Sequence, residues 1–418
     1  MHTFCTVETV TMTAIREIEL EGHVIDSLIL AKVLDKIMDL DGEFEIITFR
    51  VGTHKRDPSY VRLAVKGRNE QHLDAILSVL HRLGARIPEI EDVYLDTSPR
   101  DKVVPQGFYS TTNHPTYVHH VGRWMPVEDI EMDCMIVVTD ERALCTPINH
   151  IKTGDQIVIG QRGVRVTPPE RPRKRSLFEF MGGGISSERP SQTLIRQIAE
   201  EMMQAKLQGR EVAVVAGPAV SHTGASEALS RIIHRGFVNA LLAGNALAVH
   251  DIERDLYGTS LGLDIKTAEL VSEGHKNHLY AISEVVRYGS IAEAVRQGGV
   301  KSGIMYECVI NKVPFVLAGS IRDDGPLPDV ITDVMAAQDA MRELLKGVDL
   351  VLMMATTLHS IAVGNMLPSY VKTICIDINP ATVTKLIDRG TAQAIGVVTD
   401  VGTFLPMLAD ELNSLDVE

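Results

Sequence analysis

The second half of the chain repeats one pattern, a short apolar run followed by a segment with helical periodicity. The runs read EVAVVAG, VNALLAG, VPFVLAG, DLVLMMA, TICID and AIGVVTD. Strands that are apolar at nearly every position are buried on both faces, as in a parallel sheet covered by its helical crossovers. We therefore expect an α/β protein with a doubly wound, Rossmann-like domain over residues 186–418.

Residues 1–100 show amphipathic strands and two helices instead. AIREIELEG, FEIITFRV and YVRLAVKG predict strands, and in the last of them Val61, Leu63 and Val65 alternate with polar residues, as in a sheet with one wet face. Helices are predicted at 25–40 and along an apolar stripe at 73–83. With VYLDT as the closing strand the order is βαββαβ, which predicts a ferredoxin-like α+β small domain.

Residues 101–185 have the pattern of a small β-rich middle module that ends in a linker. MIVVTD, IKTGDQIVIG and GVRVTPP predict short strands separated by turn residues. We interpret the basic run RPRKR, and the glycines at 182–184 that follow it, as a solvated linker. The glycine run has no strand before it and no Lys-Ser/Thr after it, so it does not fit a phosphate loop.

Charge and cysteine spacing restrict the class of protein. The chain has 41 basic and 55 acidic residues and a net charge of −14, which argues against nucleic acid as the main partner. The five cysteines lack CxxC spacing, so we expect neither a disulfide framework nor a bound metal. No leader and no long apolar run is recognisable, which predicts a cytoplasmic protein without a membrane partner. The apolar helices of the last domain lead us to expect a homo-oligomer.

Polar clusters follow the predicted parallel strands, where ligands of α/β sheets bind. The turn GPAVSHTGA contains His222, which can exchange a proton near neutral pH; a helix cap with an incidental histidine is the alternative. The stretch GNALAVHDIERDLYGTSLGLDIK is richer, and its alternative is an ordinary strand-turn-helix with a solvated acidic face. Its candidate residues are Asn245, Ala246, His250, Asp251, Asp264 and Lys266.

Two further clusters follow later strands. In AGSIRDDGPLPD, Asp323 and Asp324 can face a ribose, an amide or a substrate ammonium, although a solvated turn explains them equally well. In ATTLHS, Thr356 and Thr357 stand at a helix start, where free N–H groups suit a pyrophosphate.

The last two strand ends supply acidic residues. Asp377, at the end of TICID, is placed to accept both ribose hydroxyls of an adenosine, which favours NAD over NADP. Asp400 and Val401 follow the final strand. No GxGxxG fingerprint occurs, and because several α/β families bind nucleotides or sugars at equivalent loops, spacing alone leaves the ligand open.

Long motifs in the chain resemble one family from about residue 10 onwards. REIELEGHVIDSLILAKVLD, GFYSTTNHPTYV and VGRWMPVEDIEMDCMIVV resemble the region named after lysine-oxoglutarate reductase/saccharopine dehydrogenase (LOR/SDH). VAGPAVSHTGA, GNALAVHDIERDLYGTSLG, AGSIRDDGPLPDV and ATTLHSIAVGN resemble the remainder of the archaeal ornithine cyclodeaminase family. The same module forms the carboxyl-terminal half of the cyanobacterial arginine dihydrolase/ornithine cyclodeaminase fusions.

The resemblance implies NAD-dependent conversion of L-ornithine to L-proline and ammonia, through imine formation, cyclisation and re-reduction by the same cofactor. It implies a place in arginine catabolism and proline biosynthesis. Because the chain starts almost at the LOR/SDH-like region, we expect no arginine dihydrolase domain and no arginine hydrolysis. Two alternatives stay open, an NAD-binding amino-acid sensor and another NAD-dependent amino-acid dehydrogenase with a saccharopine-like substrate.

The resemblance also implies residue roles. One base must deprotonate an amine and one acid must protonate the departing one, and our candidates are His222, Asp251 and Asp264, with Lys266 or an arginine holding the substrate carboxylate. The expected cofactor contacts, with Thr357 added from the helix start, are Asn245, Ala246, Asp324, Thr356, Thr357, Leu358, His359, Asp377, Asp400 and Val401.

Overall fold

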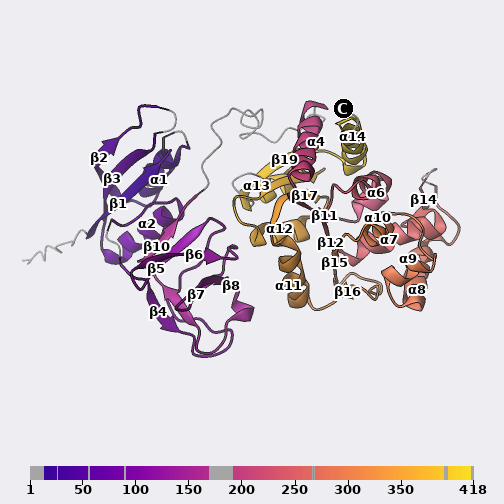
Figure 1. Ribbon diagram of the computed structural model, residues 1–418, viewed down its shortest axis with the longest axis horizontal. Helices are drawn as coiled ribbons and strands as arrows, with labels where there is room; N and C mark the ends of the chain where they lie inside the picture. The colour runs from indigo at the N-terminus through magenta and orange to yellow at the C-terminus, as the bar shows by residue number, and fades with distance from the viewer. Residues whose placement is uncertain are drawn as a thin grey trace, which may run out of the picture. The chain divides into compact units, whose positions relative to one another are not determined.

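The computed structural model describes residues 14–25, 27–54, 57–88, 91–168, 192–265, 267, 269–389 and 394–415. The chain divides into two compact units, Met1–Arg175 and Ser176–Glu418, each of which is described by itself (Figure 1). The RPRKR run and the glycines at 182–184 lie outside the described residues, and so does Lys266.

The first unit begins with a three-stranded antiparallel sheet packed against two helices (Figure 1). The strand order is β1-β3-β2, and apolar residues that alternate along β3 form the centre of its core. Asn69 caps the amino terminus of α2, and its side chain accepts a hydrogen bond from the His72 N–H. In chain order the elements are β1 (Ala14–Gly22), α1 (Ile29–Asp39), β2 (Glu43–Arg50), β3 (Ser59–Gly67) and α2 (Glu70–Arg82).

The α+β character predicted for this region is confirmed, but its closing strand was placed wrongly. VYLDT forms β4 (Tyr94–Thr97), which pairs with β9 of the next sheet. The position beside β1 is occupied instead by Arg86, which forms an isolated antiparallel bridge to Glu19 with N–H···O distances of 2.7 and 2.8 Å. Pro88 follows and has no N–H with which to extend that pairing, so no fourth strand develops there.

The β-rich module is a seven-stranded sheet in the order β10-β5-β6-β8-β7-β9-β4. Its neighbours are antiparallel except for β6 and β8, and the buried side chains of Val118, Ile136 and Val158 lie in its core. Besides β4, the strands are β5 (Thr116–His120), β6 (Arg123–Glu128), β7 (Met135–Val138), β8 (Ala143–Thr146), β9 (Gln156–Ile159) and β10 (Val164–Val166).

The second unit contains a parallel sheet in the order β16-β15-β12-β11-β17-β18-β19. The chain winds outward from β11 to one edge and then returns to place β17 on the other side of β11. This reversal defines a doubly wound sheet, so the predicted Rossmann-like fold is confirmed. The strands are β11 (Glu211–Ala216), β12 (Ala240–Gly244), β15 (Phe315–Ala318), β16 (Val330–Ile331), β17 (Val348–Met354), β18 (Lys372–Asp377) and β19 (Ala394–Val398).

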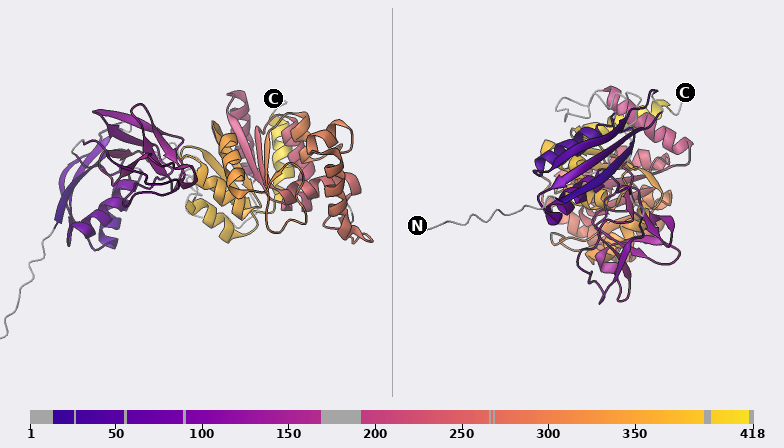
Figure 2. Two further views of the ribbon diagram at one scale, coloured as in Figure 1. Left: turned by 90° about the horizontal axis from the view of Figure 1, so that it is seen from below. Right: turned by 90° about the vertical axis from the view of Figure 1, so that its left-hand side faces the viewer.

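Helices cover both faces of this sheet (Figure 2). The strands are buried on both sides: in β11, Val214 packs into one hydrophobic cluster and Val215 into the other. The helices are α4 (Gln192–Leu207), α5 (Ala219–His222), α6 (Ser226–His234), α7 (Asn245–Tyr257), α8 (Asn277–Tyr288), α9 (Ile291–Arg296), α10 (Ile304–Ile310), α11 (Val334–Leu345), α12 (Thr357–Met366), α13 (Pro380–Arg389) and α14 (Val401–Leu415). Among the described residues, none of these helices is long and apolar enough to cross a bilayer.

Two local features become clear only in the structure. α11 begins at Val334, because Val330 and Ile331 add a short edge strand and the Asp333 carboxylate then caps the helix by accepting from the N–H groups of Met335 and Ala336. The Gly-Thr-Ser-Leu-Gly turn is a small hairpin, formed by β13 (Thr259–Ser260) and β14 (Leu263–Asp264).

Candidate functional site at the carboxyl edge of the parallel sheet

The polar clusters that follow the parallel strands lie along one edge of the sheet, because all strands point the same way. At the reversal point, the Gly217 N–H donates to the Met354 carbonyl at 2.9 Å and brings the end of β11 against the end of β17. A Cβ atom on Gly217 would lie 2.0 Å from the Ala355 carbonyl oxygen, so this approach requires glycine. The main chain is therefore closely packed at this edge, beside the reversal point.

A cavity of about 540 Å³ opens at this edge. It lies beside the ends of β12 and β15 and is closed on its outer side by the segment around the β13–β14 hairpin and by α8. Six residues that the sequence singled out line it, His222, Asn245, Ala246, His250, Asp323 and Asp324. The other lining residues are Pro218, Val249, Leu261, His275, His278, Ile282, Ser320 and Arg322.

Three histidines form a row in the cavity wall. His222 comes from α5, His250 from α7 and His278 from α8; the ring centroids of the first two are 4.6 Å apart and those of the last two 6.2 Å apart. In the part of the chain that the structure describes, no group of histidine, cysteine, aspartate or glutamate side chains is arranged to hold a metal ion. Imidazole rings in such a row can hydrogen bond to a ligand in the cavity and exchange protons with it.

Glu253 lies behind His250 and is the best-connected carboxylate near the cavity. Its side chain is fully buried, its Oε2 lies 2.8 Å from His250 Nδ1, and its Oε1 accepts from the Thr259 hydroxyl at 2.8 Å and the Gly262 N–H at 3.3 Å. Burial by itself would raise the pKa of Glu253, but the hydrogen bonds from His250, Thr259 and Gly262 outweigh it and hold that pKa below its usual range. Asn277 donates to Thr259 Oγ1 at 2.9 Å and completes the network.

His222 is held differently. Its Nδ1 lies 2.7 Å from the Ser260 hydroxyl, and no carboxylate contacts either ring nitrogen among the described residues. Burial, with a smaller contribution from the neighbouring His250, lowers the pKa of His222 to about 4. The His222 ring is therefore neutral at pH 7 and can donate or accept a hydrogen bond, but it cannot supply a proton as an imidazolium.

Asn245 fixes the loop that forms one wall of the cavity. Its Oδ1 accepts from the Leu327 N–H at 3.1 Å, and its Nδ2 donates to the Gly325 carbonyl at 3.2 Å. Asp324, on the same loop, lies 3.3 Å from His278 Nε2 through its Oδ2 and remains mostly exposed. The loop is thus joined to α7 on one side and to α8 on the other.

The predicted cofactor residues of α12 lie next to this cavity. Thr356 precedes the helix, the Thr357 hydroxyl is 3.4 Å from that of Thr382, and the Leu358 side chain is 76% exposed. His359 packs against the end of β12, where a Cβ atom on Gly244 would come within 2.9 Å of its Cε1. Burial lowers the pKa of His359.

The last three predicted cofactor residues follow β18 and β19. Asp377 ends β18, and its Oδ1 accepts from the Asn379 N–H at 2.8 Å. Asp400 directly precedes α14, and its carbonyl accepts from the Thr403 N–H at 3.1 Å. Val401 is 3% exposed and its side chain belongs to the hydrophobic core, so any cofactor contact from it would come from the main chain.

The other predicted catalytic residues do not line this cavity. Asp251 is buried on the opposite side of α7, where it accepts hydrogen bonds from the Ser226 hydroxyl and, at 2.9 Å, from the Met305 N–H; burial raises the pKa of Asp251. It joins α7 to α6 and α10 through these contacts, so its catalytic role stays a prediction. Asp264 accepts from the Thr267 N–H at 2.9 Å and closes the turn after the hairpin. Lys266 lies outside the described residues.

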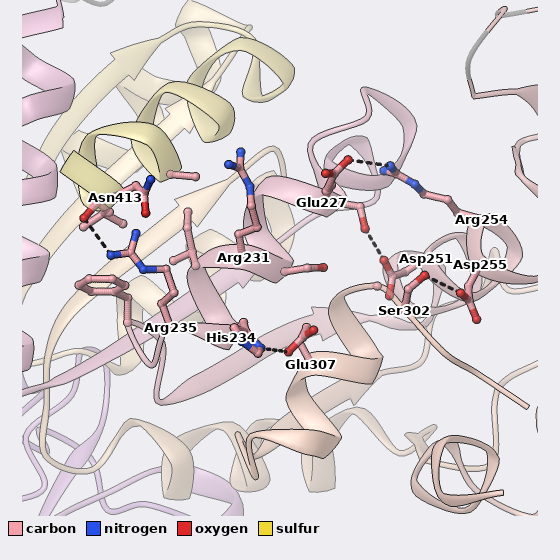
Figure 3. A pocket seen from close by; sticks show the side chains of 17 residues that line it. Glu227, Arg231, His234, Arg235, Asp251, Arg254, Asp255, Ser302, Glu307 and Asn413 are labelled. Atoms are coloured by element: carbon pink, nitrogen blue, oxygen red, sulfur yellow. Dashed lines mark hydrogen bonds and ion pairs between the residues drawn. The ribbon is translucent and has the colours of Figure 1, made fainter. Parts of the chain in front are cut away.

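Asp251 belongs to the wall of a second, larger cavity of about 690 Å³ (Figure 3). Its walls come from α6, α7, α10 and α14, and charged side chains in it already pair with one another. His234 Nδ1 is 3.0 Å from Glu307, and Arg254 is 4.0 Å from Glu227. No residue that directly follows a parallel strand lines this cavity, so the smaller cavity at the sheet edge is the better candidate active site.

Three side chains that are prominent in the structure were not identified from the sequence, Glu253, His278 and Arg322. His250 was named as a candidate but was given no role. A usable signal was present: His250 and Glu253 are three positions apart in a predicted helix, and so are His275 and His278 in EGHKNH. The Thr259–Glu253 contact could not have been read from spacing, because it depends on the path of the hairpin.

Three family models match the chain in succession. The LOR/SDH bifunctional enzyme conserved region matches residues 15–114, the first region of the carboxyl-terminal part of ArgZ-like arginine dihydrolases matches 115–195, and the Rossmann fold of that same part matches 196–408.

Curated relatives match over nearly their whole length. An "Ornithine cyclodeaminase" of Archaeoglobus fulgidus is 60% identical over 403 residues, covering 96% of this chain and 99% of that protein. One of Methanocaldococcus jannaschii is 59% identical over 411 residues, covering 96% and 97%.

Two solved structures are also similar. Apo ArgZ, a cyanobacterial arginine dihydrolase, has a TM-score of 0.86 at 40% identity and covers 99% of this chain and 61% of its own. The ternary complex of AgrE with ornithine and NAD+ has a TM-score of 0.54 at 42% identity and covers 97% and 58%.

Proposed function

The chain belongs to the archaeal ornithine cyclodeaminase family, and we propose that it converts L-ornithine to L-proline and ammonia with NAD as its cofactor. One observation of this structure supports the proposal. A cavity with a row of histidines and a buried glutamate opens at the carboxyl edge of a Rossmann-like sheet. A relative of the same fold has been crystallised with ornithine and NAD+ together.

The residues present fit a dinucleotide along the sheet edge. Gly217 and Gly244 leave no space for a Cβ atom, because the Ala355 carbonyl approaches the end of β11 and the His359 ring approaches the end of β12. Leu358 on α12 and Ile378, which follows Asp377 in the chain, are 76% and 71% exposed and offer apolar surface. Asp377 would bind the ribose, while the N–H groups at the start of α12 would bind phosphate oxygens. When bound, NAD supplies the hydride acceptor and donor for the reaction.

We assign proton transfer to His250. Glu253 holds its Nδ1, which fixes the ring with Nε2 as the nitrogen available to the cavity, and a buried carboxylate in that position stabilises the imidazolium that forms when Nε2 takes a proton. His250 would take a proton from a substrate ammonium and return one to the departing ammonia. Glu253 touches no substrate in this arrangement and is a positioning residue.

Charged groups at the cavity mouth fit the two ends of an amino acid. Arg322 offers a planar fork of N–H donors for the substrate carboxylate, and Asp324 offers a carboxylate for the side-chain ammonium. His222, neutral at pH 7, would hydrogen bond to an amine without competing for its proton. Asp264 and Lys266 stay predictions, because Asp264 does not line the cavity and Lys266 lies outside the described residues.

The decisive experiment is to incubate the purified protein with NAD and L-ornithine and to quantify proline, ammonia and reduced nicotinamide together. The proposal predicts equal amounts of proline and ammonia with no net reduced nicotinamide, because the cofactor is regenerated in each turnover. Accumulation of reduced nicotinamide would identify an ordinary amino-acid dehydrogenase. Binding of NAD and ornithine without either product would identify a sensor.

A further inference from the structure

A third cavity lies in the first unit, and its lining includes no residue discussed so far as catalytic. Its volume is about 270 Å³, and it is formed where β1 and the segment after α2 meet β6 and β10. Its charged lining residues comprise four arginines and two glutamates, although the whole chain has a net charge of −14. These residues are Arg16, Arg86, Arg162, Arg165, Glu19 and Glu91.

Three of the arginines have acidic partners. Arg16 lies 2.9 Å from Glu70, Arg162 lies 3.1 Å from Glu91, and Arg86 reaches Glu21 more weakly, at 3.7 Å. Within the described ranges, no carboxylate pairs with Arg165. The positive charge of Arg165 is therefore the one that no acidic side chain offsets.

Aromatic rings hold Arg165 in place. Its guanidinium carbon lies 4.7 Å from the centroid of the Tyr117 ring and 4.5 Å from that of Trp124. Rings that contact the flat faces of a guanidinium leave its N–H edges free to donate. Burial, and next the charge of Arg86, lower the pKa of Arg165, as expected for a cation without a counterion.

A second donor among the cavity residues, Arg86 Nε, is buried without a hydrogen-bond partner. His81, whose pKa burial lowers to about 4, is neutral at pH 7 and donates to the Ala85 main chain, so its Nε2 adds no donor. An arginine nitrogen can only donate and most buried polar groups in proteins have a partner, so the unpartnered Arg86 Nε indicates a missing acceptor.

We propose that this cavity binds a small oxyanion, the carboxylate or phosphate group of a metabolite, with Arg165 as the main contact and Arg86 beside it. The planar fork of an arginine matches two oxygens of such a group. The volume lies just below the range of about 300–1,000 Å³ that is usual for ligand pockets, which favours a compact anion. The proposal is independent of the reaction catalysed by the second unit.

Trp124 makes the site directly observable, because it lines the cavity and is the only tryptophan in the chain. The full-length protein is titrated with inorganic phosphate and, separately, with succinate, while sodium chloride keeps the ionic strength constant. We expect a saturable change in Trp124 emission with at least one probe, and the probe with the lower Kd identifies the group. Isothermal calorimetry with the same probes measures binding without depending on emission.

Variants test the assignment of Arg165. Arg165→Gln should weaken binding about ten- to a hundred-fold, the size expected for one charge-assisted bidentate contact. The affinity of Arg165→Lys should lie between those of the wild type and Arg165→Gln, because lysine keeps the charge but lacks the planar fork of donors. The control is Arg142→Gln: Arg142 pairs with Glu128 in the same β-rich module, is exposed, and does not line the cavity.

Two results would overturn the proposal, the absence of any saturable emission change and binding heat, or equal affinity in the wild type and Arg165→Gln. Circular dichroism establishes that Arg165→Gln is folded. If it is not, Arg86→Gln takes its place, since Arg86 pairs with Glu19 through its main chain and the side chain can be changed without removing that bridge.

Discussion

Replacing Glu253 by glutamine isolates the role proposed for this carboxylate. Glutamine keeps the shape of the side chain, and its Oε1 can still accept from the Thr259 hydroxyl and the Gly262 N–H, which lie 2.8 and 3.3 Å from that position. Its amide nitrogen then faces His250 Nδ1, 2.8 Å from the replaced oxygen. Because an amide N–H can only donate, Nδ1 must accept, and the ring proton moves to Nε2. His250 can then no longer take a proton from the cavity side.

We therefore expect kcat of Glu253→Gln to fall about 10²- to 10⁴-fold, the range for losing general acid–base catalysis through a wrong tautomer. The Kd for NAD, measured by calorimetry, should not change. The free energy of unfolding should fall by only about 1–3 kcal/mol, because one hydrogen bond to a charged group is lost while two acceptor contacts remain. His250→Gln should lose a similar factor, and the double variant should be no worse than either single one.

The matched control is Glu307→Gln, which removes a second His–Glu pair in the same domain, at 3.0 Å from His234 and outside the candidate active site. It should leave kcat unchanged. Steady-state formation of proline across a pH series is the assay. If Glu253→Gln retains wild-type kcat and pH profile, or if Glu307→Gln loses as much activity, then His250 is not the proton-transfer residue.

Three other predictions concern single positions. An NMR titration of His222 should give a midpoint near 4, since burial and His250 disfavour its imidazolium. Between pH 6.5 and 4 the imidazole is protonated in the unfolded chain but not in the folded one, so the free energy of unfolding should fall as the pH is lowered through this range. Chemical denaturation at several pH values should show this fall, and the fall should be smaller in His222→Asn. Asp251→Asn should keep wild-type kcat and lower the free energy of unfolding by at most about 1 kcal/mol, because an amide can accept from the Met305 N–H and donate to the Ser226 hydroxyl. A large fall in kcat in a normally folded variant would support the catalytic role predicted for Asp251. Gly217→Ala should lower the free energy of unfolding by about 1–3 kcal/mol and weaken NAD binding, because the added Cβ meets the Ala355 carbonyl. In the control Gly364→Ala the nearest atom to the added Cβ is Met353 Cε at 3.9 Å, so a melting experiment should show no change or a stabilisation of up to about 1 kcal/mol.

The sheet of the second unit could be predicted from the sequence because its strands are buried on both faces and are apolar throughout. β11 and β17 needed no tertiary information to be recognised. The fourth strand of the small domain could not be predicted, since VYLDT has a strand pattern whichever sheet it joins. Only the path of the chain after α2, where Pro88 cannot extend the pairing of Arg86 with β1, leaves VYLDT to the second sheet.

The candidate site was predictable only in part, for a related reason. Residues that directly follow a strand must lie at the sheet edge, which is why Asn245 and His222 were identified. On α7, however, consecutive residues face different surroundings: His250 lines the cavity, whereas Asp251 is buried on the other side. Sequence position located the helix at the site, but its rotation about its own axis decides which polar residue reaches the ligand.

The contacts of the Glu253 carboxylate are local in the chain. All its hydrogen-bond donors come from positions 250–262, on α7 and the hairpin directly after it. Closing so short a segment costs little entropy, so this network can break and re-form without the surrounding sheet opening. The amide hydrogen of Gly262 donates to the carboxylate, and its exchange with solvent deuterium would therefore report how often the support of His250 opens, independently of global unfolding.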